Sequence, residues 1–195
     1  MVPVTRGGKL RICLDPKDLN KALLHTPHPM TTIDDVIPQL ANAKVFSVLD
    51  AKDSFWQVEL EEESSYLTTF WTPFGRYRWL RMPFGPSSSS DEFQRRQNNA
   101  LEGIPGSVSI VDDVLVFGKS ATLEEAIIYH DRNPLAVLER AQQANLVFNP
   151  EKIRLRLPRV TYCGHVFSAE GLTVDPDKVM AIQALKAPSD VKELH

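Results

Sequence analysis

Two adjacent aspartates interrupt an otherwise apolar stretch near the middle of the chain. The segment SIVDDVLVFG runs from Ser109 to Gly118 and carries Asp112 and Asp113 between aliphatic and aromatic residues. Two carboxylates a few ångströms apart repel by roughly 4 kcal/mol at an effective dielectric constant near 20, unless a cation lies between them. Aspartates at turns commonly serve only to accept backbone hydrogen bonds. Because this turn lacks the Gly or Asn of a usual tight turn, a cation site stands as the alternative to a plain turn.

A third carboxylate follows a second apolar segment. Asp50 ends KVFSVLD, whose β-branched and aromatic residues are typical of a strand. Side chains at the ends of adjacent strands can converge, and carboxylate oxygens are ligands that Mg²⁺ prefers. Two Mg²⁺ ions about 3.5–4 Å apart stabilise the attacking and leaving oxygens of a phosphoryl displacement. Asp50, Asp112 and Asp113 are therefore candidate metal ligands for nucleotidyl transfer.

Short strands and helices must position these acids. Alternating residues predict a strand over 9–14, and Thr32 is a candidate N-cap of a short helix shortened by Pro38. Residues 107–118 are predicted to form a hairpin whose tip is Asp112-Asp113. The segments 55–60, 66–72 and 76–82 are expected to form an antiparallel meander.

Further elements follow this meander in the second half of the chain. Residues 90–101 have helical spacing after a serine cap at Ser89 or Ser90. The segment from Thr122 to Leu146 is predicted to be helical with a break near Asn133-Pro134, and His130 is expected to lie at the surface. Two or three strands around turns at 149–150, 164 and 170–171 precede a last helix, which begins at Asp175 with Pro176 in its first position.

Composition places the chain among ordinary globular proteins. It has 195 residues, 43% hydrophobic and 24% charged, with a formal net charge of −3. No apolar run approaches the roughly 18 residues that span a bilayer, and the first residues do not read as a signal peptide, so we expect a cytoplasmic or nuclear protein without membrane contact. Cys13 and Cys163 are expected to be small buried hydrophobic residues. The basic clusters taken singly indicate solvated faces.

Seven motifs in one order carry a family resemblance. They are RICLDPKDLNKA, AKVFSVLDAKDSFWQVEL, TTFWTPFGRYRWLRMPFG, FQRR, IVDDVLVFG, NPEK and CGHVFSAEGL. This order resembles the reverse transcriptase domain of gypsy-type long-terminal-repeat retrotransposon polyproteins, over nearly the whole chain. The resemblance implies an α+β fold of the right-hand polymerase type, reduced to fingers and palm, with an antiparallel palm sheet, helices packed on one face, and the thumb and connection largely absent.

The resemblance also implies that residues 1–195 form one domain, which is divided into subdomains. The fingers would be partial and comprise about 1–45 and 56–85, the palm about 46–55 and 86–175, and the start of the connection about 176–195. Asp50 matches the first metal-binding aspartate of the family, and Asp112 and Asp113 match the acidic pair of its catalytic hairpin. They would be the catalytic residues and would bind two Mg²⁺ ions, with Mn²⁺ as an alternative.

The resemblance also implies which residues bind the substrates. Arg11 matches the arginine that holds the incoming triphosphate, where a planar guanidinium fork suits phosphate. Phe55 matches the aromatic residue beneath the sugar that rejects a 2′-hydroxyl. The remaining matches are nucleotide-binding residues Lys9, Lys17, Phe84 and Gly85, and template- or primer-binding residues Phe93, Gln94, Gly164 and His165.

The function implied is RNA-directed DNA polymerisation, with a template–primer duplex and deoxynucleoside triphosphates as partners. Ile110 departs from the family, which usually has Tyr at that position of the hairpin, and GPSSSSDEFQ replaces apolar contacts and a proline with serines and acids. These departures support an alternative, a catalytically inactive fragment derived from a retroelement that only binds nucleic acid. A third reading is an interaction module without a nucleic-acid role, which the negative net charge favours.

Overall fold

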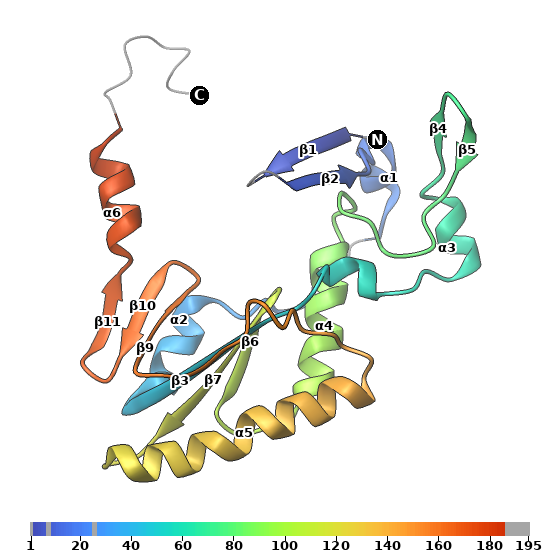
Figure 1. Ribbon diagram of the computed structural model, residues 1–195. Coiled ribbons are helices and arrows are strands. Elements are labelled where there is room, and N and C mark those ends of the chain that lie inside the picture. Colours follow the sequence, from blue (N-terminus) through green and yellow to red (C-terminus); the bar gives the residue numbers. More distant parts are fainter. Residues whose placement is uncertain (1, 7–8, 25–26, 186–195) are drawn as a thin grey trace.

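An antiparallel sheet forms the centre of the protein in this computed structural model, which describes residues 2–6, 9–24 and 27–185 (Figure 1). Its strand order is β6-β7-β3-β8, and all neighbours are antiparallel. The bounds are Ala43–Asp50 for β3, Ser107–Ile110 for β6, Asp113–Lys119 for β7 and Arg154–Leu157 for β8. The sheet confirms the antiparallel palm expected from the sequence, and its two central strands are β3 and β7.

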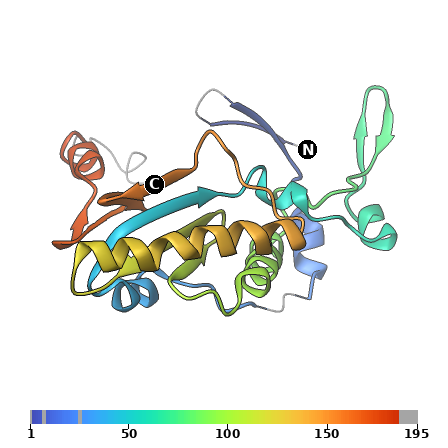
Figure 2. The same cartoon turned by 60° about the horizontal axis from the view of Figure 1, so that its bottom comes forward.

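Both faces of this palm sheet are covered, and most residues of its two central strands are apolar and buried. On one face Val114 and Val116 of β7 pack with α4 (Ser89–Leu101) and α5 (Leu123–Gln143). Figure 2 shows α5 running along the sheet. On the other face Leu115 and Phe117 pack with α2 (Ile33–Val36), the 3₁₀ helix Ile37–Leu40 and the strands β9 (Arg159–Tyr162) and β10 (His165–Ser168). The two long helices thus share one face, as expected.

Helix α5 is continuous through Pro134, and the predicted break is wrong. Proline in a helix interior removes one hydrogen bond and costs about 3 kcal/mol. The burial of Ala126, Val137 and Ala141 offsets this cost. His130 is also not a surface residue: it is 1% exposed, and its Nε2 lies 2.8 Å from Ser47 Oγ of β3.

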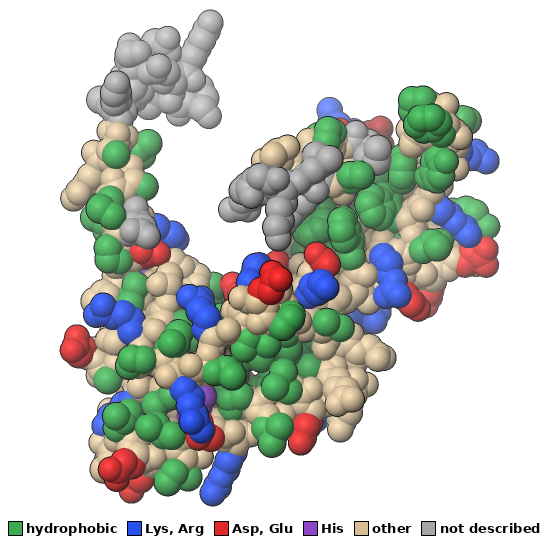
Figure 3. All heavy atoms as spheres, in the orientation of Figure 1, with side chains coloured by type: hydrophobic (Ala, Val, Ile, Leu, Met, Phe, Trp, Pro, Cys, Tyr) green, Lys and Arg blue, Asp and Glu red, His purple; other side chains and the backbone are tan. Residues whose placement is uncertain are grey.

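A second lobe, beside the one formed by the palm sheet and its helices, is built from small strands and helices. Strands β1 (Val2–Arg6) and β2 (Lys9–Cys13) form a hairpin followed by α1 (Lys17–Ala22). Helix α3 (Glu62–Tyr66) precedes the hairpin of β4 (Phe70–Thr72) and β5 (Gly75–Tyr77). Hydrophobic side chains gather on this second hairpin in Figure 3; those exposed there are Trp71, Phe74 and Tyr77.

The meander predicted over 55–82 is only partly correct. Residues Ser54–Gln57 form a 3₁₀ helix rather than a strand. Asp53 and Ser54 have positive φ angles of 54° and 21°, which turn the chain away from the extended conformation. The antiparallel pairing expected between 66–72 and 76–82 is present as the β4–β5 hairpin. Of the pairing expected for 55–60, a single β-bridge between Glu59 and Arg81 is present.

The C-terminal part forms a three-stranded sheet in the order β11-β10-β9. The bounds are Arg159–Tyr162 for β9, His165–Ser168 for β10 and Gly171–Val174 for β11. Helix α6 covers Pro176–Gln183, which confirms the helix predicted after Asp175. Cys163 is exposed in the turn between β9 and β10, so the expectation of burial is wrong for this residue; Cys13 is half-buried. None of the helices in the described part of the chain is both long and apolar enough to cross a membrane.

Candidate active site

Three aspartates meet at one end of the palm sheet. Asp50, the last residue of β3, is paired directly with Asp113, the first residue of β7. The N–H of Ala51 donates to the carbonyl of Asp112 at 2.7 Å. The convergence predicted from the sequence is therefore present, although the contribution of each residue to catalysis stays a prediction.

The hairpin turn differs by one residue from the expected one. Ile110 pairs with Asp113, so the tip is Val111-Asp112 and not Asp112-Asp113. Val111 has a φ of 51°, a rare conformation for a β-branched residue. Its N–H donates to the side-chain carbonyl of Gln94, a bond that supports the strained turn.

The electrostatics of the site reflect crowded carboxylates. Burial raises the pKa of Asp113, and the charges of Asp50 and Asp112 raise it further, while Lys152 and Arg154 act in the opposite direction. The ammonium group of Lys152 lies 2.9 and 2.8 Å from the two carboxylate oxygens of Asp50. The positive charge beside the acids is therefore a side chain of the protein itself, the ammonium group of Lys152.

The donor set suits a divalent ion in its chemistry. Within residues 2–6, 9–24 and 27–185 no group of three or more His, Cys, Asp or Glu side chains is arranged to hold a metal ion. Asp50 instead binds Lys152, whose side chain is 55% exposed and can move into solvent. Carboxylates that repel one another and accept a positive charge are the oxygen donors that Mg²⁺ prefers. The chemistry of the donors therefore fits such an ion, while in this structure Lys152 is the cation that pairs with Asp50.

Aromatic side chains lie beside the acids. Asp50, Asp112 and Phe84 line a cleft of about 360 Å³. Phe55 is buried beneath Phe84, with ring centroids 4.8 Å apart, and also contacts Phe93 at 5.8 Å. Phe84 is thus the one of these three rings that lines the cleft, and the roles of Phe55 and Phe84 toward a nucleotide stay predictions.

The loop at Gly85 connects this cleft to the second lobe. The N–H of Leu14 donates to the carbonyl of Phe84 at 2.9 Å, and the side-chain amide of Asn20 donates to the carbonyl of Gly85 at 3.2 Å. Lys17, in the adjacent helix α1, is exposed. The backbone of Lys9 and Arg11 lies in β2, but their side chains are outside the described residues.

Phe93 and Gln94 are buried in α4, which does not present them on a surface. Besides accepting from Val111, the amide of Gln94 donates to the carbonyl and the hydroxyl of Ser109 at 3.2 and 3.0 Å. Gln94 thus contacts the β6–β7 hairpin, which carries Asp112 and Asp113, and not the solvent. Direct contact of these two residues with a template or primer stays a prediction.

Gly164 and His165 lie at the β9–β10 turn. Cys163 and Gly164 have φ angles of 48° and 76°, which suit a two-residue hairpin turn. This hairpin is tied to the acids by Tyr162, whose hydroxyl donates to the carbonyl of Asp113 at 3.1 Å. Burial raises the pKa of Tyr162 far above its usual range, so the hydroxyl keeps its proton.

Lys152 and Tyr162 are two site residues that the sequence analysis missed. Lys152 belongs to the motif NPEK, and this motif was the only signal that could have marked it. Nothing in the local pattern of RVTYCGH distinguishes Tyr162 from an ordinary strand residue.

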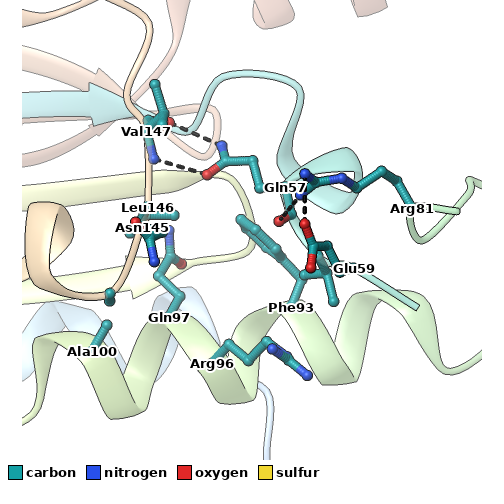
Figure 4. A pocket seen from close by; sticks show the side chains of 12 residues that line it. Gln57, Glu59, Arg81, Phe93, Arg96, Gln97, Ala100, Asn145, Leu146 and Val147 are labelled. Carbon is teal, nitrogen blue, oxygen red and sulfur yellow. Dashed lines mark hydrogen bonds and ion pairs between the residues drawn. The ribbon is translucent and has the colours of Figure 1, made fainter. Parts of the chain in front are cut away.

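A larger pocket of about 580 Å³ lies between α4 and the segment 144–147 (Figure 4). Gln97 of α4 lines it and is 1% exposed, and neither end of its amide has a hydrogen-bond partner among the residues that the structure describes. An unsatisfied buried amide costs about 1–3 kcal/mol.

Replacing Gln97 by methionine, which has a similar shape, is therefore expected to stabilise the fold by about 1 kcal/mol. Urea unfolding monitored by circular dichroism measures this change. Gln39→Met is the matched control, because Gln39 is exposed and its amide donates to the carbonyl of Asp35 at 3.1 Å. A loss of stability in Gln97→Met alone would show that the amide is satisfied by water.

The fold and the acidic site together define a class of protein, the fingers and palm of a polymerase. The chain superimposes on a foamy viral protease–reverse transcriptase solved in complex with double-stranded DNA, with a TM-score of 0.87 and 25% identity, covering 98% of this chain and 33% of that one. The family model described as reverse transcriptase (RNA-dependent DNA polymerase) matches residues 5–167. The chain belongs to the reverse transcriptase family.

Curated relatives confirm the resemblance to gypsy-type elements. The chain is 36% identical over 190 residues to the retrovirus-related Pol polyprotein from transposon 412 of Drosophila melanogaster, covering 96% of this chain and 15% of that protein. It is 32% identical over 183 residues to the Pol polyprotein from transposon gypsy of the same organism, covering 93% of this chain and 17% of the polyprotein. The chain thus spans less than a fifth of the length of these relatives.

Proposed function

We propose that this chain catalyses RNA-directed addition of deoxynucleotides to a primer 3′ end. The observation that carries the proposal is the pairing of Asp50 with Asp113 beside the turn of Asp112, in a chain of the reverse transcriptase family. The three carboxylates would hold two divalent ions, Mg²⁺ or Mn²⁺. When bound, such ions lower the pKa of the primer hydroxyl and neutralise the triphosphate and the leaving pyrophosphate.

The other residues would bind and orient the substrates. Arg11, Lys9 and Lys17 would contact the triphosphate of the nucleotide, and Phe55 would lie beneath its sugar, with Phe84 and Gly85 beside the new base pair. The template–primer duplex would lie along the acidic hairpin, with Gly164 and His165 toward the primer and Phe93 and Gln94 acting through the hairpin. Because phosphoryl transfer needs little covalent help, these contacts would contribute mainly by positioning and electrostatics.

Primer extension tests the proposal directly. We expect the purified chain to extend a primer on a homopolymer RNA template with Mg²⁺ or Mn²⁺. Asp112→Asn is expected to lower the rate at least about 10²–10³-fold, because it removes a charged ligand while keeping the shape. Asp34→Asn, at an exposed position of α2, is the matched control and should keep full activity.

An inactive nucleic-acid-binding fragment is the second candidate. Ile110 in the catalytic hairpin and the ion pair between Lys152 and Asp50 favour it. This reading predicts that a folded wild-type chain gives no extension with either metal ion. It also predicts duplex binding that weakens steeply with salt and is unaffected by Asp112→Asn.

A further inference from the structure

The side chain of Gln57 joins two segments that are far apart in the sequence (Figure 4). Its Oε1 accepts from the N–H of Val147 at 2.8 Å, and its Nε2 donates to the carbonyl of Val147 at 2.9 Å. The same Nε2 donates to the carbonyl of Lys52. One amide therefore satisfies both backbone groups of a residue 90 positions away, as a neighbouring strand would do.

These two segments carry the acid Asp50 and the cation Lys152. The N–H of Lys52 donates to the carbonyl of Val147 at 2.9 Å, and the N–H of Asn149 donates to the carbonyl of Asp50 at 2.8 Å. Residues 147–149 therefore run antiparallel beside residues 50–52, with a β-bridge between Ala51 and Phe148. The N–H of Lys152 donates to the carbonyl of Asn149 at 3.1 Å, which places Lys152 directly after this short ladder.

Gln57 is itself held in place from the other side. Its own carbonyl accepts from Nη1 of Arg81 at 3.0 Å, and Arg81 pairs with Glu59 at 2.8 Å. Gln57 also ends the 3₁₀ helix Ser54–Gln57, whose Phe55 is fixed in the aromatic cluster. Gln57 is half-buried as a residue, and these contacts hold its backbone, so the position of its amide determines where the segment 147–149 lies.

We propose that Gln57 is a positioning residue of the active site. It holds residues 147–149 against residues 50–52, and so fixes the carboxylate of Asp50 and the ammonium of Lys152 relative to each other. This inference rests on the proposed polymerase function, to which it adds a residue that does not contact the reacting atoms. A displacement of about 1 Å at a reacting group can lower a rate on the order of 10²-fold.

Gln57→Met tests the proposal, because methionine keeps the length of the side chain and loses all three hydrogen bonds. Gln97→Met is the matched control: it lies across the same pocket, and no hydrogen bond of its amide is lost. We expect amide hydrogen exchange, followed by NMR, to accelerate at Val147, Lys52 and Asn149 in Gln57→Met and to stay slow at Val48 and Leu115 in the palm sheet. Gln97→Met should leave the first three amides unchanged.

Steady-state extension provides the functional readout. In an active wild-type chain, kcat should fall about 10- to 100-fold in Gln57→Met, while the KM for the nucleotide changes less than about threefold, because the side chains proposed to contact the triphosphate belong to β2 and α1. If Gln57→Met does not fold, Gln57→Asn is tested in its place, because the side chain of asparagine is one methylene too short to reach Val147.

Each result decides the matter. Unchanged exchange at Val147, Lys52 and Asn149 overturns the inference, whatever the activity. Faster exchange with an unchanged kcat also overturns it, because the ladder would then not position the chemistry. A wild-type chain without extension refutes the proposed function and with it the catalytic role of Gln57, while the exchange data still report separately whether the side chain holds the ladder.

Discussion

Asp113→Asn is expected to make the chain more stable and at the same time inactive. Asp113 is the acid whose pKa is raised by burial and by the charges of Asp50 and Asp112. Its ionised form is therefore disfavoured in the folded state, and asparagine removes one charge of this cluster without changing its shape. We expect a higher Tm than that of wild type at pH 7, and loss of primer extension.

The stability gained in Asp113→Asn depends on pH, because the pKa of Asp113 is raised in the folded state. An acid whose folded-state pKa is raised contributes stability that is fully present below its unfolded-state pKa and is lost as the pH rises through the folded-state pKa. The advantage of Asp113→Asn over wild type should therefore be absent near pH 3 and should grow as the pH rises above 3.8, the ordinary value for Asp. Scanning calorimetry across this range measures it.

Asp34→Asn is the control, since this exposed acid belongs to α2, outside the cluster of acids. A variant Asp113→Asn that is less stable than wild type at pH 7 would contradict the prediction. It would mean that the attraction of Lys152 and Arg154 exceeds the burial and repulsion that raise the pKa.

The convergence of the acids could be predicted because it follows from short-range patterns. Asp50 ends one apolar strand and Asp113 begins another, and the pairing of β3 with β7 brings these two residues opposite each other at one end of the sheet. Helix α4 was predictable for the same reason, because its apolar spacing and acidic first turn lie within one segment. Its expected serine cap was wrong: the N-cap is Ser88, without a side-chain bond.

Features that depend on distant partners could not be predicted. The turn tip at Val111 is strained and depends on Gln94, a residue 17 positions earlier. Lys152 reaches Asp50 across 102 positions, and Gln57 reaches Val147 across 90. His130 looked like a surface residue, since only the folded sheet shows that Ser47 provides a buried partner for it. The sequence therefore predicts which acids form the site, but it does not predict the contacts that hold them in place.

Gly85→Ala is expected to destabilise the fold strongly. Gly85 has a φ of 126°, a backbone conformation that residues other than glycine rarely adopt. An added Cβ would lie 2.2 Å from the carbonyl oxygen of Leu14. Strain of this kind costs about 1–3 kcal/mol and overpacking about 1–3 kcal/mol more. Because backbone atoms block the methyl group, β2 or the loop has to move.

The control Gly75→Ala separates these two costs. Gly75 has a similar φ of 131°, but nothing lies within 4 Å of its added Cβ, so only the strain remains. We expect Gly85→Ala to lose at least about 1 kcal/mol more than Gly75→Ala in urea unfolding. Equal losses would show that the contact with Leu14 adjusts without cost.

The same substitution tests how the two lobes cooperate. The hydrogen bond from Leu14 to Phe84 ties the end of β2, the strand of Arg11, to the loop that lines the cleft. If Gly85→Ala pushes these segments apart, the groups proposed to bind the triphosphate move away from the acids, while the acids keep their positions in the palm sheet. We therefore expect the KM for the nucleotide to rise about tenfold in the remaining folded protein, more than kcat falls. A fall in kcat alone would place the effect in the palm and would argue against the second lobe as the nucleotide-binding part.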